Sequence, residues 1–360
     1  MSYSFQKEFT LIPQSPLIHF QPELNGATLR ATEVKPKLDR YIFKHCENVP
    51  DAWKNRKTPT ALNYKLRIIC SEPTEPIPLG YRTDYDIFYG NMGDGPKKMG
   101  VMAKAKLIVT SFNSDLLKYI DKIIGNFFIV TNFGTMQGKG FGSFVVEGKD
   151  FSQENICAVL KNEYNAAHCY KFSTRSQGVF KQIKTVYSLM KSGVNFRSYR
   201  RSILFDFMHE KYDMGNEKAW LKQNGIAPAI GNNNEQKDEE SRYVRALFGI
   251  TDGVEYKNPP YKNLKVKIKE KSKEISRLNS PVFFKVINNN VYYVGMKINR
   301  EIYGKAFEFS STMGSGTICV PTESEVGKDF MDEFMQYAYK KINECKADFR
   351  DIRNITIVEV

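Results

Sequence analysis

Hydrophobic and polar residues in the first part of the chain follow the two periods that are typical of strands and helices. Alternating apolar side chains predict strands at residues 5–12, 64–70 and 101–110. Apolar spacings of three and four residues predict a helix that begins near Thr28 or Thr32, and a second helix that Ser114 caps. Residues 71–100, which are rich in proline and glycine, predict a long excursion between two strands.

The rest of the chain changes from helical spacing back to strand spacing. Residues 179–192 predict an amphipathic helix that ends at Gly193. Later segments predict a hairpin, a helix and a last strand at residues 280–287, 291–298, 328–345 and 355–358. Within residues 264–269, apolar residues alternate with three lysines, so one face of the predicted strand carries three ammonium groups. A lysine face also protects the edge strand of a sheet, and both interpretations stay open.

The predicted elements divide the chain into three parts. Residues 1–150 form a first module with a glycine-rich loop, residues 151–255 a mostly helical segment that bridges the halves or is inserted between them, and residues 256–360 a second module. The order of strands and helices in both modules is that of ferredoxin-like, RRM-like units, so the expected fold class is α+β. A weak internal echo, SPLIHF at 15–20 and SPVFFK at 280–285, also favours two related modules.

The stretch NFGTMQGKGFGSFVV at residues 132–146 has the highest density of glycine, with Lys139 at its centre. Glycines at this density let a backbone turn sharply and let another backbone approach closely. Free backbone N–H groups beside a lysine make a concavity that suits a phosphate. The spacing matches neither a P-loop nor a dinucleotide-binding fingerprint. A flexible surface turn is the alternative interpretation.

Composition favours a polyanionic partner. The 53 lysines and arginines exceed the 40 aspartates and glutamates, which gives a net charge of +13. No apolar run approaches the ~18–20 residues of a membrane span, and the N-terminus lacks the layout of a signal peptide. We therefore expect a cytoplasmic protein that binds nucleic acid rather than a membrane. The six cysteines form no C-x-x-C pair, so we expect free thiols, no zinc site and no cofactor.

Two basic clusters are candidates for contacting phosphates. Five cations crowd around the start of the first predicted helix: Arg30, Lys35, Lys37, Arg40 and Lys44. Cations are unfavourable at a helix N-terminus unless an anion is present, so this cluster indicates a phosphate ligand, with a solvated basic face as the alternative. The second cluster, NFRSYRR, interleaves aromatic residues with Arg197, Arg200 and Arg201.

Together these segments resemble the RAMP superfamily of CRISPR proteins, whose modules are ferredoxin-like and end in a glycine-rich loop. LRATEVKPKLDRY resembles the family's LR-x-[ST]-x-[IV]-K-G-x-[LM]-R helix start, with Pro36 where glycine is usual. NFGTMQGKGFGSF resembles the FGG-x-G-x-R-x-R-x-GFGS loop in a shorter form with fewer arginines. RALFG at 245–249 and RLNSPVFFKV at 277–286 are similar to further family segments. The chain is most similar to the tandem-module subunit, subunit one, of type III-B Cmr complexes.

This resemblance implies an RNA-binding structural subunit of a type III-B Cmr effector complex in antiviral defence, with other Cmr subunits as partners. It implies contacts with crRNA and target RNA near the 3′ end of the guide, while guide–target pairing reads the sequence. We expect the RNA backbone to contact the basic helix start, the glycine-rich loop and the arginine cluster. The residues expected at these contacts are His19, Gln21, Arg30, Lys35, Lys37, Arg40, Gly138, Lys139, Gly140, Phe141, Arg197, Arg200 and Arg201.

Two other functions stay open. Some RAMP proteins cut crRNA precursors without a metal, and His19, on a strand near basic residues, is the candidate acid or base for that alternative. A histidine beside apolar residues also has a purely structural interpretation. Asp39 lies at a helical position without the loop context of the subunits that cut target RNA, so we expect no enzyme activity. A polyanion-binding protein unrelated to CRISPR would bind any nucleic acid in a salt-sensitive way.

Overall fold

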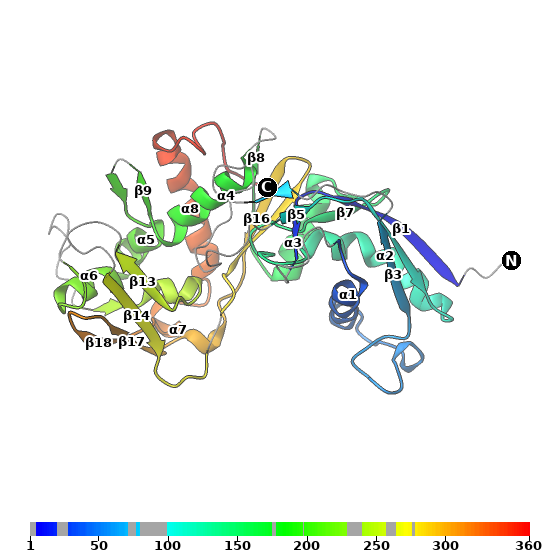
Figure 1. Ribbon diagram of the computed structural model, residues 1–360, viewed down its shortest axis with the longest axis horizontal. Coiled ribbons are helices and arrows are strands. Elements are labelled where there is room, and N and C mark those ends of the chain that lie inside the picture. Colours follow the sequence, from blue (N-terminus) through cyan, green and yellow to red (C-terminus); the bar gives the residue numbers. More distant parts are fainter. Residues whose placement is uncertain are drawn as a thin grey trace.

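The chain folds into two lobes that lie along its longest axis (Figure 1). The computed structural model describes residues 5–19, 28–70, 77–79, 99–174, 178–196, 198–228, 240–256, 264–275 and 278–360. Most of the predicted excursion at 71–100 and of the polar loop at 231–240 lies outside these residues. Helices and antiparallel sheets together make the mixed α+β fold that the hydrophobic pattern predicts.

The first lobe is built on a four-stranded antiparallel sheet. Its elements in chain order are β1 (Gln6–Pro13), α1 (Ala31–His45), β3 (Lys65–Cys70), β6 (Ala105–Thr110), α2 (Ser114–Val130) and β7 (Phe144–Val146). The strands lie in the order β3-β6-β1-β7. Alternate strand residues such as Leu11 and Leu107 are buried in one core with the apolar sides of α1 and α2. The cap of α2 is Asn113, whose side chain accepts from two backbone N–H groups, rather than Ser114.

A second four-stranded antiparallel sheet uses strands that are far apart in the sequence. Its elements are β8 (Cys169–Ser173), α4 (Val179–Lys191), β15 (Val282–Ile287), β16 (Asn290–Gly295), α8 (Phe330–Cys345) and β19 (Val358–Glu359). The strand order is β15-β16-β8-β19. This sheet differs from the predicted boundaries, because β8 and α4 come from residues 151–255, which we expected to bridge two modules. The five-residue β8 is recognisable as a strand only through its neighbours β16 and β19.

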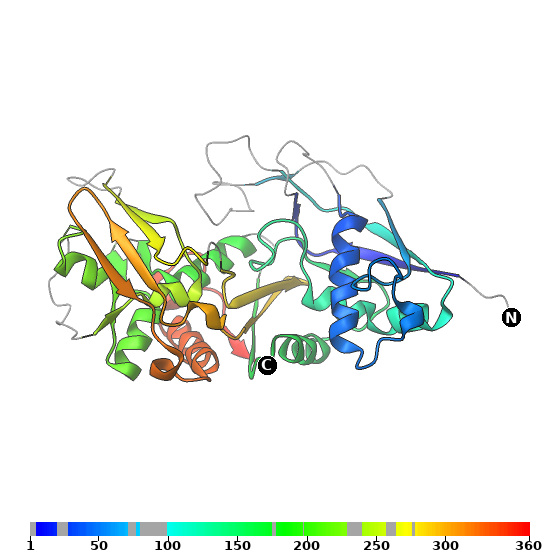
Figure 2. The same cartoon turned by 90° about the horizontal axis from the view of Figure 1, so that it is seen from below.

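Two insertions enlarge the second lobe between these elements. The first contains β9 (Val194–Phe196), β10 (Ser198–Arg200), α5 (Ile203–Tyr212), β11 (Gly215–Asn216), α6 (Glu217–Gln223), β12 (Ser241–Arg242), β13 (Gly253–Tyr256) and β14 (Leu264–Glu270). The second contains β17 (Ala306–Ser310), β18 (Ser315–Cys319) and α7 (Glu323–Val326). Strands from both insertions form a third sheet in the order β13-β14-β17-β18. Figure 2 shows the β17–β18 hairpin, in orange, at the end of this lobe farthest from α1, in blue.

Shorter elements connect these units. Helix α3 (Gln153–Tyr164) leads from the first sheet to β8, and the side chain of Ser152 caps its N-terminus. A small sheet joins β2 (Leu17–Ile18), β5 (Met99–Val101) and β4 (Ile77–Pro78). Short 3-10 turns occur at Asp51–Trp53, Val244–Phe248, Arg300–Ile302 and Lys346–Asp348.

A buried lysine and the glycine-rich loop join the two lobes. Lys285 on β15 donates to the carbonyls of Phe128 and Thr131, at 2.6 and 3.0 Å, and to Oδ1 of Asn132 at 3.1 Å. These acceptors lie at the C-terminal end of α2, where helix carbonyls lack partners and attract a cation. The side chain of Ser143 also donates to the carbonyl of Val286 at 2.7 Å. Because these buried contacts cross the boundary, the lobes are held in one arrangement.

Within the part of the chain that the structure describes, no helix is both long enough and apolar enough to span a bilayer.

Candidate nucleic-acid interface

Helix α1 presents the basic residues of the first predicted cluster on its surface. Its apolar side, with Val34, Leu38 and Ile42, packs into the first core. Arg30 is exposed at the N-cap position, and its side chain makes no capping hydrogen bond. From Arg30 to Lys44 the helix rises by about 21 Å at 1.5 Å per residue. The cluster is therefore spread along the helix, and Lys35 lies on a different side of it from Lys37.

Two lysines of this cluster already have acceptors within the protein. Lys35 donates to Asp39 at 2.8 Å and to the carbonyl of Leu62 at 3.0 Å. Lys37 donates to Glu33 at 2.9 Å, to the carbonyl of Asn132 at 3.0 Å and to Gln137 at 2.8 Å. Burial lowers the pKa of the Lys37 ammonium, although the Glu33 carboxylate opposes this shift. These contacts make Lys37 a tie between α1 and the glycine-rich loop.

Arg40 lies in a groove of about 300 Å³ at the junction of the lobes. We call this the α1 groove; its lining residues are Lys37, Arg40, Tyr41, Lys44, Val130, Thr131, Asn132, Gln137, Glu163, Tyr164 and Phe283. Arg40 is exposed, and its Nε donates to the carbonyl of Pro36 within its own helix at 3.3 Å. Lys44 pairs with Glu163 at 2.8 Å but keeps a half-exposed side chain. Of the three cations that line the groove, Lys37 pairs with Glu33 and Lys44 with Glu163, so Arg40 is the one without a described ion pair.

The glycine-rich loop is tightly packed, which excludes the flexible surface turn. Its backbone N–H groups largely donate within the protein; the donors are Phe133, Gly134, Thr135, Lys139, Gly140, Gly142 and Ser143. Gly142, at φ +67°, approaches the backbone of Phe133 so closely that a Cβ would lie 2.7 Å from its carbonyl carbon. Because these backbone donors are occupied, the glycine-rich loop does not form the phosphate-binding concavity that its sequence predicts.

Lys139 points into the protein and does not present its ammonium to solvent. The residue is only 7% exposed, and its Nζ lies 3.1 Å from the centre of the Tyr187 ring and 3.3 Å from Oγ of Ser280. Burial, with the nearby Lys191 cation, lowers the pKa of Lys139 well below its usual range. This placement is contrary to our expectation of a surface RNA contact, because the loop turns inward to dock on β15.

The neighbours of Lys139 have the same docking role. The carbonyl of Gly138 accepts from the backbone of Phe284 at 3.2 Å, and a Cβ on Gly140 would lie 3.0 Å from Val286. Phe141 is fully buried and stacks on Phe180 of α4, with ring centres 3.8 Å apart. The loop thus resembles the family motif in sequence, yet here it binds the second lobe.

His19 lies at the end of β2, close to Arg30 and Glu33. Burial, followed by the positive charge of Arg30, lowers the pKa of His19, while Glu33 opposes the shift. Both effects favour the neutral form of the imidazole. Gln21, its predicted neighbour at the interface, lies outside the described residues.

The arginine cluster of the middle segment lies in the other lobe from α1. Arg200 is exposed at the end of β10, and Arg201 pairs with Asp206 of α5 at 3.4 Å. Arg197 lies outside the described residues. Because β9, β10 and α5 belong to the far lobe in Figure 1, the structure does not bring these arginines together with α1.

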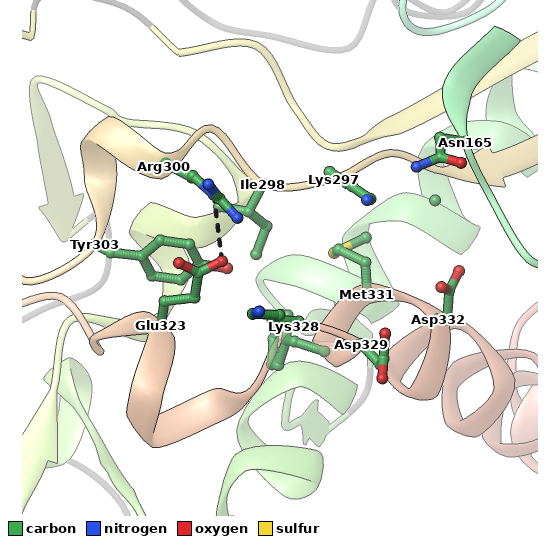
Figure 3. Close-up of a pocket in the computed structure, with 12 residues that line it drawn as sticks. Asn165, Lys297, Ile298, Arg300, Tyr303, Glu323, Lys328, Asp329, Met331 and Asp332 are labelled. Atoms are coloured by element: carbon green, nitrogen blue, oxygen red, sulfur yellow. Dashed lines mark ion pairs between the residues drawn. The ribbon is translucent and has the colours of Figure 1, made fainter.

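A smaller pocket of about 90 Å³ lies beside the start of α8 (Figure 3). Arg300 and Glu323 form an ion pair across it at 3.4 Å. Its other charged residues are Lys297, Lys328, Asp329 and Asp332. Three cations face three carboxylates, so this pocket does not favour a polyanion. In the described ranges, no cluster of histidine, cysteine and acidic residues could hold a metal ion.

Sequence reasoning missed Lys285, Tyr164 and Phe283. Lys285 is a lysine inside an apolar run, SPVFFKVI, and this break in the pattern is the one signal that could have marked it. Tyr164 and Phe283 come from the end of α3 and from β15, and their ring centres lie 4.8 Å apart at the groove. These residues are far from α1 in the sequence, so no spacing along the chain could predict that they line the same groove.

Comparison with known families identifies two domain models that together cover most of the chain. A family model described as the Cmr1 N-terminal domain matches residues 4–194, and one described as the Cmr1 C-terminal domain matches residues 199–356. The chain belongs to the Cmr1 family. Membership implies a subunit of a type III-B Cmr CRISPR effector complex, and the resemblance to this RAMP family is thereby confirmed.

Other comparisons add little beyond the Cmr1 family. The crystal structure of apo Cmr1 from Pyrococcus furiosus is similar to the chain with a TM-score of 0.40 and 9% identity. The match covers 88% of this chain and 99% of that chain. No curated protein matches the chain. The boundary between the two Cmr1 domains falls after α4, whereas the second sheet already includes β8.

Proposed function

We propose that this Cmr1-family chain is an RNA-binding structural subunit whose α1 groove contacts the backbone of crRNA or target RNA near the 3′ end of the guide. Family membership supports the effector complex, and other Cmr subunits are its proposed protein partners. The strand orders of the two main sheets, with a βαββαβ chain order in each, support the interpretation of both as ferredoxin-like modules. We place this function in the cytoplasm.

The exposure of Arg40 in the α1 groove, without a described ion pair, is the main support for this proposal. A guanidinium has five N–H donors in a planar fork that matches phosphate oxygens. Arg40 uses one of them for the carbonyl of Pro36. Among the described residues no carboxylate forms an ion pair with Arg40, although Glu163 lines the same groove. An exposed arginine without an ion pair, in a groove, is available to bind a phosphate.

Arg30 extends this contact along the helix, and aromatic rings border it. Arg30 is exposed at the N-terminus of α1, where the helix dipole also favours an anion. Tyr41 and Tyr164 line the groove beside Arg40. Aromatic rings next to cations suit a single strand, because unpaired bases stack on them. We retain Arg30 and Arg40 as the RNA contacts of α1 and do not include the buried Lys139.

The double variant Arg30→Ala/Arg40→Ala tests this function. Its affinity for a fluorescent single-stranded RNA, measured by anisotropy across a salt series, should fall by about 25-fold at 0.1 M salt, and the salt slope should fall by about 1.4 for two lost phosphates. Arg350→Ala/Arg353→Ala removes the same charge from exposed positions in the other lobe and is the matched control. Equal losses in both variants, or none in the first, would refute the α1 groove as an RNA site.

A metal-independent endoribonuclease is the second candidate, and one observation favours it. Burial and the Arg30 charge lower the pKa of His19, which favours the neutral form that a general base needs. We propose a structural role instead, because His19 is half-buried at the end of β2 beside Arg30 and Glu33. Cleavage of a crRNA precursor by the purified protein, abolished in His19→Ala, would support the nuclease; absence of cleavage by the unmodified protein would remove it.

A further inference from the structure

The third sheet places three lysines in a row on its exposed face. Lys265, Lys267 and Lys269 of β14 are all exposed, while Val266 and Ile268 between them are buried. The buried side packs in the core of the second lobe together with Phe307, Phe309 and Ile318 of β17 and β18. The alternation that the sequence shows is therefore a true division between an apolar inner face and a cationic outer face.

Protection of a sheet edge does not explain the central lysine of this row, Lys267. β14 pairs with β13 on one side and with β17 on the other, so it is an inner strand of the sheet. Its residues 264–267 pair with β13 and residues 267–270 with β17, so Lys267 has paired neighbours on both sides and needs no edge protection. Three exposed ammonium groups at alternate positions of one strand repel one another, and a bound anion would reduce that repulsion.

The neighbouring strands place a carboxylate opposite each outer lysine of the row and none opposite the central Lys267. Lys267 at the centre lies opposite Gly253 on β13 and Ser310 on β17, and no described carboxylate forms an ion pair with it. Glu255 approaches Lys265 only to 3.9 Å. Glu308 lies opposite Lys269 in the register. Hydroxyl residues of the same face, Ser310, Ser315 and Thr317, add hydrogen-bond donors beside the lysines.

We propose that this lysine row binds the phosphate backbone of single-stranded RNA as a second contact, separate from the α1 groove. Alternate residues of an antiparallel strand are about 6.8 Å apart, which suits successive phosphates of an extended nucleic-acid strand. On the described outer face of the sheet, the strand residues include no aromatic ring on which a base could stack. Binding there is therefore independent of base sequence.

The lysine row lies in a different lobe from α1, as Figure 1 shows for β14 and α1. One RNA strand that reached both sites would therefore run along the molecule from one lobe to the other. The inference rests on the proposed function only in taking RNA as the partner. It does not depend on Arg30 or Arg40, so each site can fail without the other.

The triple variant Lys265→Gln/Lys267→Gln/Lys269→Gln tests the row in the full-length protein. With a fluorescent single-stranded RNA long enough to span both lobes, the salt slope should fall by about 2 and the affinity at 0.1 M salt by about 100-fold, as expected for three lost phosphate contacts. The control variant Lys57→Gln/Lys104→Gln/Lys118→Gln removes the same charge from exposed positions in the first lobe. It should bind RNA as the unmodified protein does.

Two results would overturn the proposal. Equal losses in the triple variant and its control would show a general effect of net charge. Unchanged RNA binding in the triple variant would exclude RNA at this face, and loss of a partner subunit in the same variant would then assign the row to an acidic protein. The Arg30→Ala/Arg40→Ala variant tests the α1 groove separately, so a negative result for the lysine row would not contradict RNA binding at the α1 groove.

A footprint on the unmodified protein gives a second readout that needs no variant. Bound single-stranded RNA should slow acetylation of Lys265, Lys267 and Lys269, measured by mass spectrometry, while Lys57 reacts at its original rate. Equal acetylation of the row with and without RNA would contradict the proposal even if the triple variant failed to fold.

Discussion

Substituting alanine for Gly142 tests whether the glycine-rich loop is the packed structure described above. Gly142 has φ +67°, and a Cβ there would lie 2.7 and 2.9 Å from the carbonyl carbon and nitrogen of Phe133. Gly148, a few residues later, has φ +74° but nothing within 4 Å of a Cβ. The two glycines share the same backbone strain and differ in the contact, so Gly148→Ala is a matched control.

The magnitudes follow from these contacts. An alanine in the left-handed region costs about 1–2 kcal/mol, which is the whole expected effect of Gly148→Ala. Gly142→Ala must also displace the fully buried Phe133, an overpacking cost of about 1–3 kcal/mol. It further strains two hydrogen bonds, from Phe133 to Gly142 at 3.0 Å and from Gly142 to Pro16 at 2.9 Å, worth about 1 kcal/mol each. We therefore expect Gly142→Ala to destabilise the protein by about 4–7 kcal/mol.

Urea-induced unfolding measured by tryptophan fluorescence separates the two variants. The chain has two tryptophans, and Trp53 is buried in the core of the first lobe. In a Trp220→Phe background Trp53 alone reports on that lobe. Equal losses of unfolding free energy for Gly142→Ala and Gly148→Ala would refute the packed loop and restore the flexible turn.

Two buried lysines give further predictions. Lys285→Met should lower the free energy of unfolding by about 2–4 kcal/mol in urea titrations, because several carbonyls lose their donor. Burial lowers the pKa of Lys285, so between its folded pKa and about 10.4 the unfolded chain binds more protons than the folded chain. The free energy of unfolding therefore rises with pH across this range. Lys285→Met should make that rise smaller. Lys139→Met should leave stability equal or higher and RNA affinity in anisotropy unchanged, because Lys139 is buried without a described carboxylate. Weaker RNA binding by Lys139→Met would instead support the predicted RNA contact.

The internal echo illustrates what a short repeat can and cannot indicate. The two main sheets have the same strand order, as two related modules require. Yet SPLIHF follows β1, the first strand of its sheet, whereas SPVFFK leads into β15, the second strand of the other. The two segments thus occupy different positions in their sheets, and the repeated architecture is carried by the hydrophobic pattern rather than by this repeat.

Only tertiary structure decided where the candidate site lies. The sequence showed Lys139 among glycines, but not that the loop turns inward and buries the lysine against Tyr187. The sequence predicted both Arg40 and Lys37 as phosphate contacts. In the fold, Lys37 donates to three acceptors of the protein, whereas Arg40 stays exposed in a groove. The groove itself joins α1, α3 and β15, which no spacing along the chain connects.

The sequence by itself determined the helices α1, α2, α4 and α8, most strands of the two main sheets, the cationic face of β14 and the Cmr1 resemblance. These features depend on local periodicity and on motifs that are contiguous in the chain. The membership of β8 in the second sheet, the inner position of β14 and the role of Lys285 were decided by tertiary structure. They depend on which strands become neighbours, and hydrogen bonds between residues over a hundred positions apart leave no periodic signal in the sequence.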